Sequence, residues 1–168
     1  GLRGVESRIR LSVAQVNVAF RRSLITAKLV LLNTAEVEYS TVGNLHMDLI
    51  NLTFGLTPKL REVHKLRQAN RADLVSLFVG GSPQIFHGIS WMLNDMRPAA
   101  NYGFNVVEGI YAPTSVFAHE IGHNLGCQHA TNDFDGSIKG VFTNSHGLRF
   151  NTTFAGRSYP MRTIMAYG

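Results

Sequence analysis

The sequence lacks a second cysteine, a long apolar run and a recognisable nucleic-acid-binding motif. Cys127 is the one cysteine among 168 residues, so no internal disulfide can form and we expect a fold held together by its core. No apolar run approaches the roughly 18 residues of a membrane span. Residues 1–10 also lack the apolar core of a signal peptide. These absences leave a globular chain long enough for one domain.

The sequence has no long run of residues with the same charge. The 16 Lys and Arg residues outnumber the 11 Asp and Glu residues and give a net charge of +5, but Arg21 and Arg22 form the only tight basic pair. A basic surface can attract nucleic acid or an acidic substrate. Scattered charge is more often a solvated surface, and we therefore expect no nucleic-acid partner and no membrane span.

The first third of the chain shows one clear helical pattern. Steps of three and four residues between apolar positions, from Val5 to Leu24, predict a helix over about 4–22. The β-branched and aliphatic residues that follow predict a strand over 24–32, which can continue to Tyr39. Residues 40–54 are less regular, and we expect a loop there.

The remaining elements predict a mixed architecture. Thr57 and Pro58 are typical of a helix start, and the helical face that follows ends near Asn70. Short apolar runs predict strands over about 73–79, 85–93 and 102–108. Pro113 opens another helix, and residues 130–160, rich in Gly, Asn, Thr and Ser, are expected to be irregular. This order predicts an α+β (mixed α/β) fold, with helices packed on a mixed sheet.

One segment has the spacing of a zinc site: His119-Glu120-Ile121-Gly122-His123-Asn124-Leu125-Gly126-Cys127-Gln128-His129. Histidines four apart lie on one face of a helix, so His119 and His123 can share a metal ion. Gly126 can take the backbone conformation that ends a helix and turns the chain, which brings His129 back as a third ligand. Three nitrogen ligands leave zinc a fourth position for water, as in catalytic sites.

Glu120, beside the first ligand, is the candidate general base. It can reach a zinc-bound water, take its proton as hydroxide attacks the scissile carbonyl, and pass the proton to the leaving amine. A bare His-Glu-x-x-His pattern also occurs by chance, and the alternative is a surface helix with three unrelated histidines. The five fixed positions of the longer pattern favour the zinc site.

This segment, together with Thr163-Ile164-Met165-Ala166-Tyr167, resembles the metzincin zinc metallopeptidases, whose signature is an extended zinc segment and a downstream methionine turn. Within that group the chain is similar to bacterial reprolysin-like enzymes, including the peptidyl-Asp metallopeptidases. The resemblance implies a metzincin-like zincin domain with a twisted, mostly parallel sheet, an antiparallel edge strand, a long active-site helix and an irregular lower C-terminal part. It also implies that Met165 lies beneath the zinc ligands without bonding the metal.

The resemblance implies a substrate site as well. In the family an edge strand binds substrate in extended form, and we expect this strand at 86–93, with Gly88, Ile89 and Ser90 nearest the cleft. The alternative is a plain structural strand. Tyr167, two residues after Met165, is typical of the astacin-like and serralysin-like branches, where such a tyrosine can reach zinc or the transition state. It can assist an oxyanion here or simply pack.

Besides Tyr167, which stands where the adamalysin-like branch commonly has proline, two features depart from the family pattern. Ala130 follows His129, where the adamalysin-like branch usually has an aspartate that supports the fold below the site. The sequence ends at Gly168, where the family continues with a pocket wall and a last helix. We expect a single catalytic domain over 1–168, with an upper part of about 1–126, a lower part of about 127–168 and the family's C-terminal helix absent.

Four further side chains have two interpretations each. Cys127 can be a reactive thiol near a cation or a small buried filler, which we favour. Arg149, Arg157 and Arg162, between the zinc segment and the methionine turn, can meet an acidic substrate side chain. The favoured alternative is that they are ordinary surface arginines.

The sequence therefore predicts a secreted, monomeric endopeptidase with zinc as its cofactor and proteins or peptides as its substrates. The second hypothesis is a zinc-binding but inactive domain or fragment that acts as an interaction module. A metal-free binding domain is a third hypothesis, which the zinc segment disfavours.

Overall fold

The computed structural model of the chain describes residues 2–81, 85–94, 99–133 and 139–167. Its helices are α1 (Leu2–Arg22), α2 (Leu45–Phe54), α3 (Pro58–Asn70), α4 (Ala99–Tyr102) and α5 (Phe117–Asn124), with a π-helical turn, η1, at Ala112–Val116. Its strands are β1 (Val75–Val79), β2 (Gly88–Ser90), β3 (Phe104–Glu108), β4 (Arg149–Phe154) and β5 (Arg157–Arg162). None of the helices in these ranges is both long and apolar enough to cross a bilayer.

The central sheet has the strand order β1-β3-β2, so β2 lies at an edge. β1 runs parallel to β3, with Val75 opposite Phe104, and β2 runs antiparallel to β3, with Ile89 opposite Val106. The expected antiparallel edge strand is therefore present. The described strands contain one parallel and one antiparallel ladder, so they do not bear out a mostly parallel sheet.

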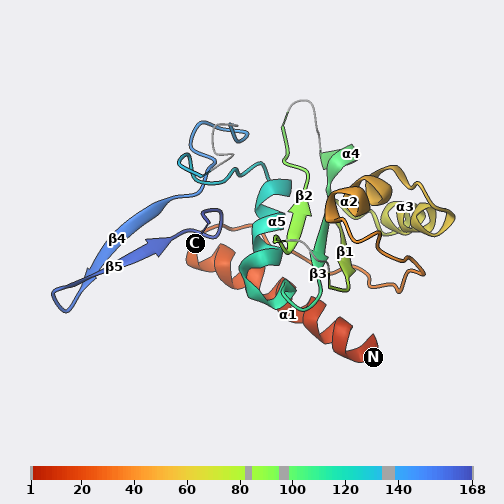
Figure 1. Cartoon of the computed structure of the whole chain (residues 1–168), viewed down its shortest axis with the longest axis horizontal. Helices are drawn as coiled ribbons and strands as arrows, with labels where there is room; N and C mark the ends of the chain where they lie inside the picture. Colours follow the sequence, from red (N-terminus) through yellow and green to blue (C-terminus); the bar gives the residue numbers. More distant parts are fainter. Residues whose placement is uncertain (1, 82–84, 95–98, 134–138, 168) are drawn as a thin grey trace.

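Alternating residues of β3 face two different hydrophobic layers. Val107 packs with α1 and α5 through Val16, Phe117 and Ile121. Phe104 and Val106 face the other way and pack with buried leucines of α2 and α3, which are Leu45, Leu49, Leu52 and Leu60. Figure 1 shows α2 and α3 on one side of the sheet and α1 and α5 on the other. The mixed α/β class is confirmed. The apolar side chains of α5 pack on the sheet and hold the helix in place.

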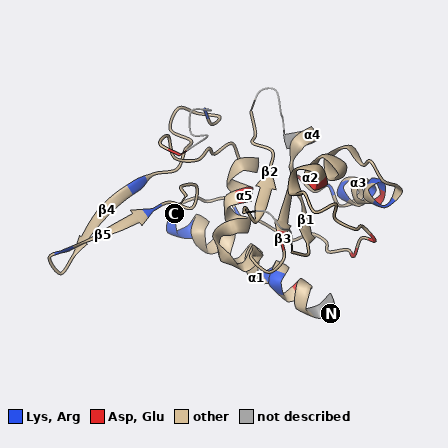
Figure 2. Ribbon diagram, viewed as in Figure 1, with Lys and Arg blue, Asp and Glu red and all other residues tan. Residues whose placement is uncertain are grey.

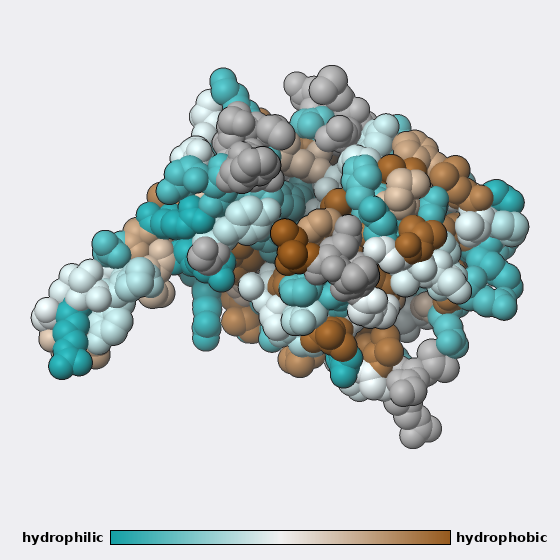
Figure 3. Space-filling model, in the orientation of Figure 1, coloured by the Kyte–Doolittle hydropathy of each residue, from teal (hydrophilic) through white to brown (hydrophobic). Residues whose placement is uncertain are grey.

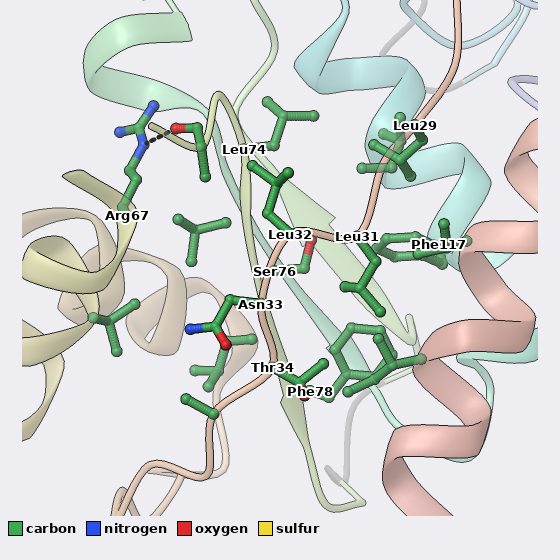
Figure 4. A pocket seen from close by; sticks show the side chains of 18 of the residues that line it. Leu29, Leu31, Leu32, Asn33, Thr34, Arg67, Leu74, Ser76, Phe78 and Phe117 are labelled. Atoms are coloured by element: carbon green, nitrogen blue, oxygen red, sulfur yellow. Dashed lines mark hydrogen bonds between the residues drawn. The ribbon is translucent and has the colours of Figure 1, made fainter. Parts of the chain in front are cut away.

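The strand expected over 24–32, and on to Tyr39, is wrong. Residues 25–42 contain no strand, because the backbone of Leu29 is bonded elsewhere. Its N–H donates to the Asn17 side chain of α1, and its carbonyl accepts from the same amide, both at 2.8 Å. The segment runs beside β1 without pairing with it (Figure 4). Both segments line a cavity of about 1140 Å³, away from the histidines of the zinc segment.

The loop expected over 40–54 is also wrong, because its second half forms α2. Asn44 caps the start of this helix by accepting a hydrogen bond from the Met47 N–H at 3.1 Å. Gly55 ends it with a left-handed backbone at φ 58°. The fully buried leucines of α2 lie on the side that meets Phe104. Both cap residues and the leucine spacing are present in the sequence, so this helix could have been predicted.

The other expected elements are found with shorter bounds. The helix predicted over 4–22 is α1, and the helix predicted from Pro58 to Asn70 is α3, capped by the Thr57 side chain. The three strands predicted after Asn70 correspond to β1, β2 and β3. The expected long active-site helix is wrong, since α5 has 8 residues. η1 precedes it, and Thr114 has an extended backbone that interrupts regular helix there.

The irregular structure expected over residues 130–160 is wrong in its second half, where the lower part contains a hairpin. β4 and β5 pair antiparallel, and the turn at Ala155 and Gly156 has positive φ at both residues, 49° and 75°. The hairpin projects away from the sheet in Figure 1, and every residue of β5 is exposed. Figure 2 shows Lys and Arg on α1, α3 and the hairpin. On the face drawn in Figure 3, hydrophobic residues are interspersed with hydrophilic ones.

Candidate metal centre

α5 is anchored to the sheet at its C-terminal end. The Asn124 amide donates to the backbone oxygens of Trp91 and Phe104, at 2.8 and 3.1 Å. It also accepts from the amide of Asn105 on β3 at 2.8 Å. Asn124 is buried, so these bonds replace the ones it would make to water. Sequence reasoning missed this role, since an asparagine inside the zinc segment gives no periodic signal.

The chain turns sharply after α5, as the glycine in the segment predicted. Gly126 has φ 89° and donates its N–H to the His123 carbonyl at 2.8 Å. A side chain at this position would be strained by that φ, and a Cβ would lie 2.7 Å from Cγ1 of Val141. The turn returns the chain so that His129 comes back to face α5.

The three predicted ligands converge on one point. The Nε2 atoms of His119 and His129 lie 2.9 Å apart, those of His119 and His123 lie 3.1 Å apart, and those of His123 and His129 lie 3.0 Å apart. They form the one cluster among the described residues in which three or more potential ligands could hold a metal ion. His119 is half-buried, and the other two are buried.

The imidazole orientations fit a bound cation. Nδ1 of His119 faces the Ile164 carbonyl at 2.9 Å, and Nδ1 of His123 faces the Cys127 carbonyl at 2.8 Å. A carbonyl only accepts, so these two nitrogens carry the protons and leave Nε2 with a lone pair. Lone pairs directed at one another across about 3 Å repel unless a cation lies among them. The donor set therefore suits a metal ion held by neutral imidazoles.

The electrostatics of His123 agree with that arrangement. Burial lowers its pKa to about 3, and the charges of His119 and His129 act in the same direction. The hydrogen bond to the Cys127 carbonyl opposes this shift without reversing it. His123 is therefore neutral at ordinary pH, which is the form that binds a metal.

Glu120 is buried beside this cluster and contacts the edge strand. Its Oε2 accepts a hydrogen bond from the Ser90 hydroxyl at 2.6 Å. Burial raises its pKa to about 8, and the bond from Ser90 partly opposes this rise. A Cβ on Gly88 would lie 2.6 Å from Oε1 of Glu120, so only glycine lets the strand pass this close. The candidate base and two of the three candidate edge residues are therefore in contact.

The predicted methionine turn packs against α5. Met165 is 9% exposed and lies against Gly122 of α5, and the neighbouring Ile164 carbonyl orients His119. The Tyr167 ring is centred 4.3 Å from the His129 ring and 5.9 Å from the His119 ring. Tyr167 is 47% exposed, so it packs on two candidate ligands while part of it remains accessible.

An aspartate that the sequence did not single out ties the lower part together. Oδ2 of Asp133 accepts hydrogen bonds from the Ala130 N–H at 3.0 Å and the Tyr167 N–H at 3.3 Å. Its Oδ1 accepts from the Arg149 guanidinium. Burial raises the pKa of Asp133, but these hydrogen bonds and the charge of Arg149 outweigh it and lower the pKa overall. We call this arrangement the Asp133 clasp.

The Asp133 clasp lies close to Ala130, the position at which the adamalysin-like branch usually has an aspartate. An aspartate three residues later links the loop after His129 to the end of the methionine turn. Arg149 also donates to the Tyr167 carbonyl at 2.9 Å, and Arg162 donates to the Ala166 carbonyl. Both arginines therefore brace the turn, whereas Arg157 lies exposed in the hairpin. Burial raises the pKa of the Cys127 thiol, which favours the filler interpretation over a reactive thiolate.

Comparison with known proteins agrees with this geometry. A family model described as metallo-peptidase family M12B, reprolysin-like, matches residues 6–130, which include the whole histidine segment. The chain is also 28% identical, over 186 aligned residues, to a peptidyl-Asp metalloendopeptidase of Pseudomonas aeruginosa. That alignment covers 98% of the chain and 29% of the relative, so the chain spans under a third of the relative's length. With most of its length matched by the family model, the chain belongs to the reprolysin-like metallopeptidases of family M12B.

Proposed function

We propose that residues 1–168 form a catalytic domain of a zinc-dependent endopeptidase. The observation that carries this proposal is the meeting of three Nε2 atoms within 3.1 Å of one another, beside the buried carboxylate of Glu120. Three imidazoles suit zinc, which is commonly held by nitrogen ligands in catalytic sites with one position left open. His119, His123 and His129 would be the ligands. The zinc, when bound, polarises the scissile carbonyl and favours ionisation of the attacking water.

The protein's own groups would manage the proton. Glu120 accepts it from the attacking water and delivers it to the nitrogen of the leaving amine. Its carboxylate must be ionised to begin, and the Ser90 hydroxyl, 2.6 Å from Oε2, stabilises that form. The second oxygen, Oε1, lies against the backbone of Gly88. Glu120 is thus placed where β2 and α5 meet, at the expected position of the scissile bond.

The substrate would bind along the free edge of β2. Gly88, Ile89 and Ser90 pair with β3 on one side only, so their other backbone groups can pair with an extended peptide. Tyr167 stacks near His129 and His119, and its hydroxyl would assist the developing oxyanion. Met165 supports the ligands from below without bonding the metal. We also propose that the enzyme is secreted and monomeric. The name of the relative, a peptidyl-Asp metalloendopeptidase, supports the further proposal that its substrates carry aspartate near the cleaved bond.

Cleavage of an unfolded protein tests the proposal. Initial rates would be compared for the untreated protein, the protein with a zinc chelator, the chelated protein with zinc restored, and Glu120→Ala. Loss of a general base lowers rates by about 10²–10⁴-fold, whereas Glu62→Ala, an exposed glutamate of α3, should cleave normally. Equal rates in all samples would refute the proposal. Stoichiometric zinc without turnover would instead support the inactive, zinc-binding module.

A further inference from the structure

A second group of polar side chains lies at the beginning of the edge strand, outside the roles proposed above. It consists of His87, Glu108 and Tyr111. We propose that His87, held in place by Glu108 and Tyr111, binds the side-chain carboxylate of an acidic substrate residue close to the scissile bond. This proposal rests on the proposed function, since it assigns a side-chain subsite to the same substrate cleft.

His87 is fixed in two directions. Its Nδ1 lies 2.9 Å from Oε2 of Glu108, and its ring stacks on that of Tyr111 with centroids 3.6 Å apart and planes 18° apart. The Glu108 N–H also donates to the His87 carbonyl at 2.9 Å. An exposed histidine normally samples several rotamers, so a hydrogen bond and a stacked ring together hold this one in a single orientation.

The different burial of His87 and Glu108 indicates that His87 is the side chain that a substrate can reach. The Glu108 side chain is 2% exposed, whereas that of His87 is 34% exposed. A buried carboxylate is costly unless a charged partner compensates it. The Glu108 carboxylate can act here as carboxylates do behind functional histidines. It fixes the orientation of the His87 ring and determines which ring nitrogens carry protons. Doubly protonated, the ring pairs with Glu108 through Nδ1 and presents Nε2–H on its opposite side.

The position of His87 along the strand places it beside the scissile bond. Gly88 and Ser90 both contact Glu120, so the reacting carbonyl is expected opposite residues 88–90. Each residue of an extended strand advances about 3.3 Å, which puts His87 within one to three residues of that point. A Cβ on Gly88 would also lie 2.9 Å from Val116 of η1, and Tyr111 directly precedes η1. The stacking partner therefore belongs to the segment that leads into α5.

The chemistry of the ligand follows from the group presented. Among the described residues, no hydrogen bond engages Nε2 of His87, so in the doubly protonated ring this N–H can donate to a substrate. A carboxylate accepts from it in a charge-assisted bond, which is stronger than the bond that a neutral amide would make. Two of the three arginines considered as acid-binding residues are less suited, because Arg149 and Arg162 are bonded within the lower part. The site therefore fits Asp or Glu in preference to Asn or Gln.

The test measures discrimination between matched peptides. Pairs of peptides would differ only by Asp or Asn at each of the two positions on either side of the scissile bond, and kcat/KM would be measured for each. The parental enzyme should favour Asp at one position by about tenfold or more, the value of one charge-assisted bond. His87→Phe combined with Glu108→Gln keeps the ring stack and removes the buried charge. In this double variant the Asp-to-Asn ratio should fall to within about twofold of unity.

Two further variants guard against misfolding and non-specific loss. His87→Gln keeps a donor for Glu108 and removes the ring, and it should also lose most of the discrimination. His46→Phe changes an exposed histidine of α2 and should retain the parental ratio. An unchanged ratio in His87→Gln and in the double variant, or no Asp preference in the parental enzyme, would overturn the subsite while leaving the endopeptidase intact. Absence of cleavage of every peptide by the parental enzyme would overturn the proposed function and, with it, this subsite.

Discussion

The upper and lower parts of the molecule each supply candidate metal ligands, but they are held together by different forces. α5, which carries His119 and His123, rests on the sheet through Phe117 and Ile121 and through the Asn124 hydrogen bonds. The loop that carries His129 follows Gly126 and is linked to the methionine turn by polar contacts around Asp133. Apolar packing together with the Asn124 hydrogen bonds therefore fixes two candidate ligands, and polar contacts link the loop that carries the third to the rest of the site.

This difference shows how a precise site can include an irregular segment. The three Nε2 atoms meet within 3.1 Å, although residues 130–133 and 139–148, the described residues between His129 and β4, form no helix or strand apart from an isolated bridge at His146. Carboxylate oxygens can accept several hydrogen bonds at once, so one buried aspartate can join three chain segments. The base of the hairpin joins this network through Arg149 and Arg162, whereas residues 150–161 are exposed. The following changes probe these levels of support separately.

The largest effect is expected in the core of the upper part. Leu49 of α2 is fully buried against Phe104, and Leu49→Ala should lower the free energy of unfolding by about 2–5 kcal/mol. Chemical denaturation of the metal-free protein measures this directly. The exposed Leu66 of α3 gives the control, and Leu66→Ala should cost far less. Similar losses for both variants would contradict a core centred on α2 and β3.

The next effect concerns the buried Glu120 and depends on pH. Its pKa in the folded, metal-free protein is about 8, above the unfolded value of 4.5. The stability that it contributes is therefore complete below pH 4.5 and is lost as pH rises toward 8. Glu120→Gln cannot ionise, so its stability relative to the parental protein should grow over this range, by about 2–4 kcal/mol.

Thermal denaturation in the presence of a chelator measures this difference at several pH values. His123 titrates in the opposite sense, because its lowered pKa makes the fold less stable as pH falls below 6.5. That contribution is common to both proteins and cancels in the comparison. A stability difference that does not change between pH 4.5 and 8 would show that Glu120 is not buried as described.

A smaller effect is expected from the Asp133 clasp. Asp133→Asn leaves Arg149 without its carboxylate partner and weakens the link between the loop after His129 and Tyr167. Zinc affinity should fall about tenfold, as for other groups that orient metal ligands indirectly, and global stability should fall less than in Leu49→Ala. Competition with a zinc indicator measures the affinity. Asp73→Asn, an exposed aspartate before β1, removes the same charge, and an equal loss in both variants would argue against the clasp.

The smallest effect is expected in the hairpin. Phe154 is 75% exposed, so Phe154→Ser should change the free energy of unfolding by no more than about 0.5 kcal/mol. Denaturant titration of the parental and variant proteins would show this. A loss above about 1.5 kcal/mol would mean that the hairpin packs against another surface in solution. The hairpin would then be held by apolar packing, as the upper part is.

The sequence predicted best where local chemistry determines structure. Thr57, Pro58 and the helical spacing that follows predicted α3, and the histidine spacing predicted the cluster of three histidines. Failures arose where distant partners decide. Asn17 captures the backbone of Leu29 and prevents the expected strand, and no pattern in residues 24–39 reveals that partner. α2 is a different failure, since its Asn44 and Gly55 caps are visible in the sequence.

The candidate site divides in the same way. The candidate ligands and Glu120 were predicted from motif spacing, and Met165 was predicted from the family resemblance. The contacts of Ser90 and Gly88 with Glu120 depend on how β2 meets α5, which the resemblance implied but spacing could not give. Asp133 and the pair of His87 and Glu108 depend on loops that have no periodic signal. Polar contacts between distant loops are therefore the part of this molecule that only a structure can supply.

A zinc titration of the metal-free protein tests the central claim most directly. Initial rates of peptide cleavage would be recorded as zinc is added to the parental protein and to Glu120→Gln, with bound zinc measured in both. The account predicts that both bind one zinc per chain, and that only the parental rate rises and levels off at one equivalent. Cleavage that does not depend on zinc, or a Glu120→Gln protein as active as its parent, would contradict it.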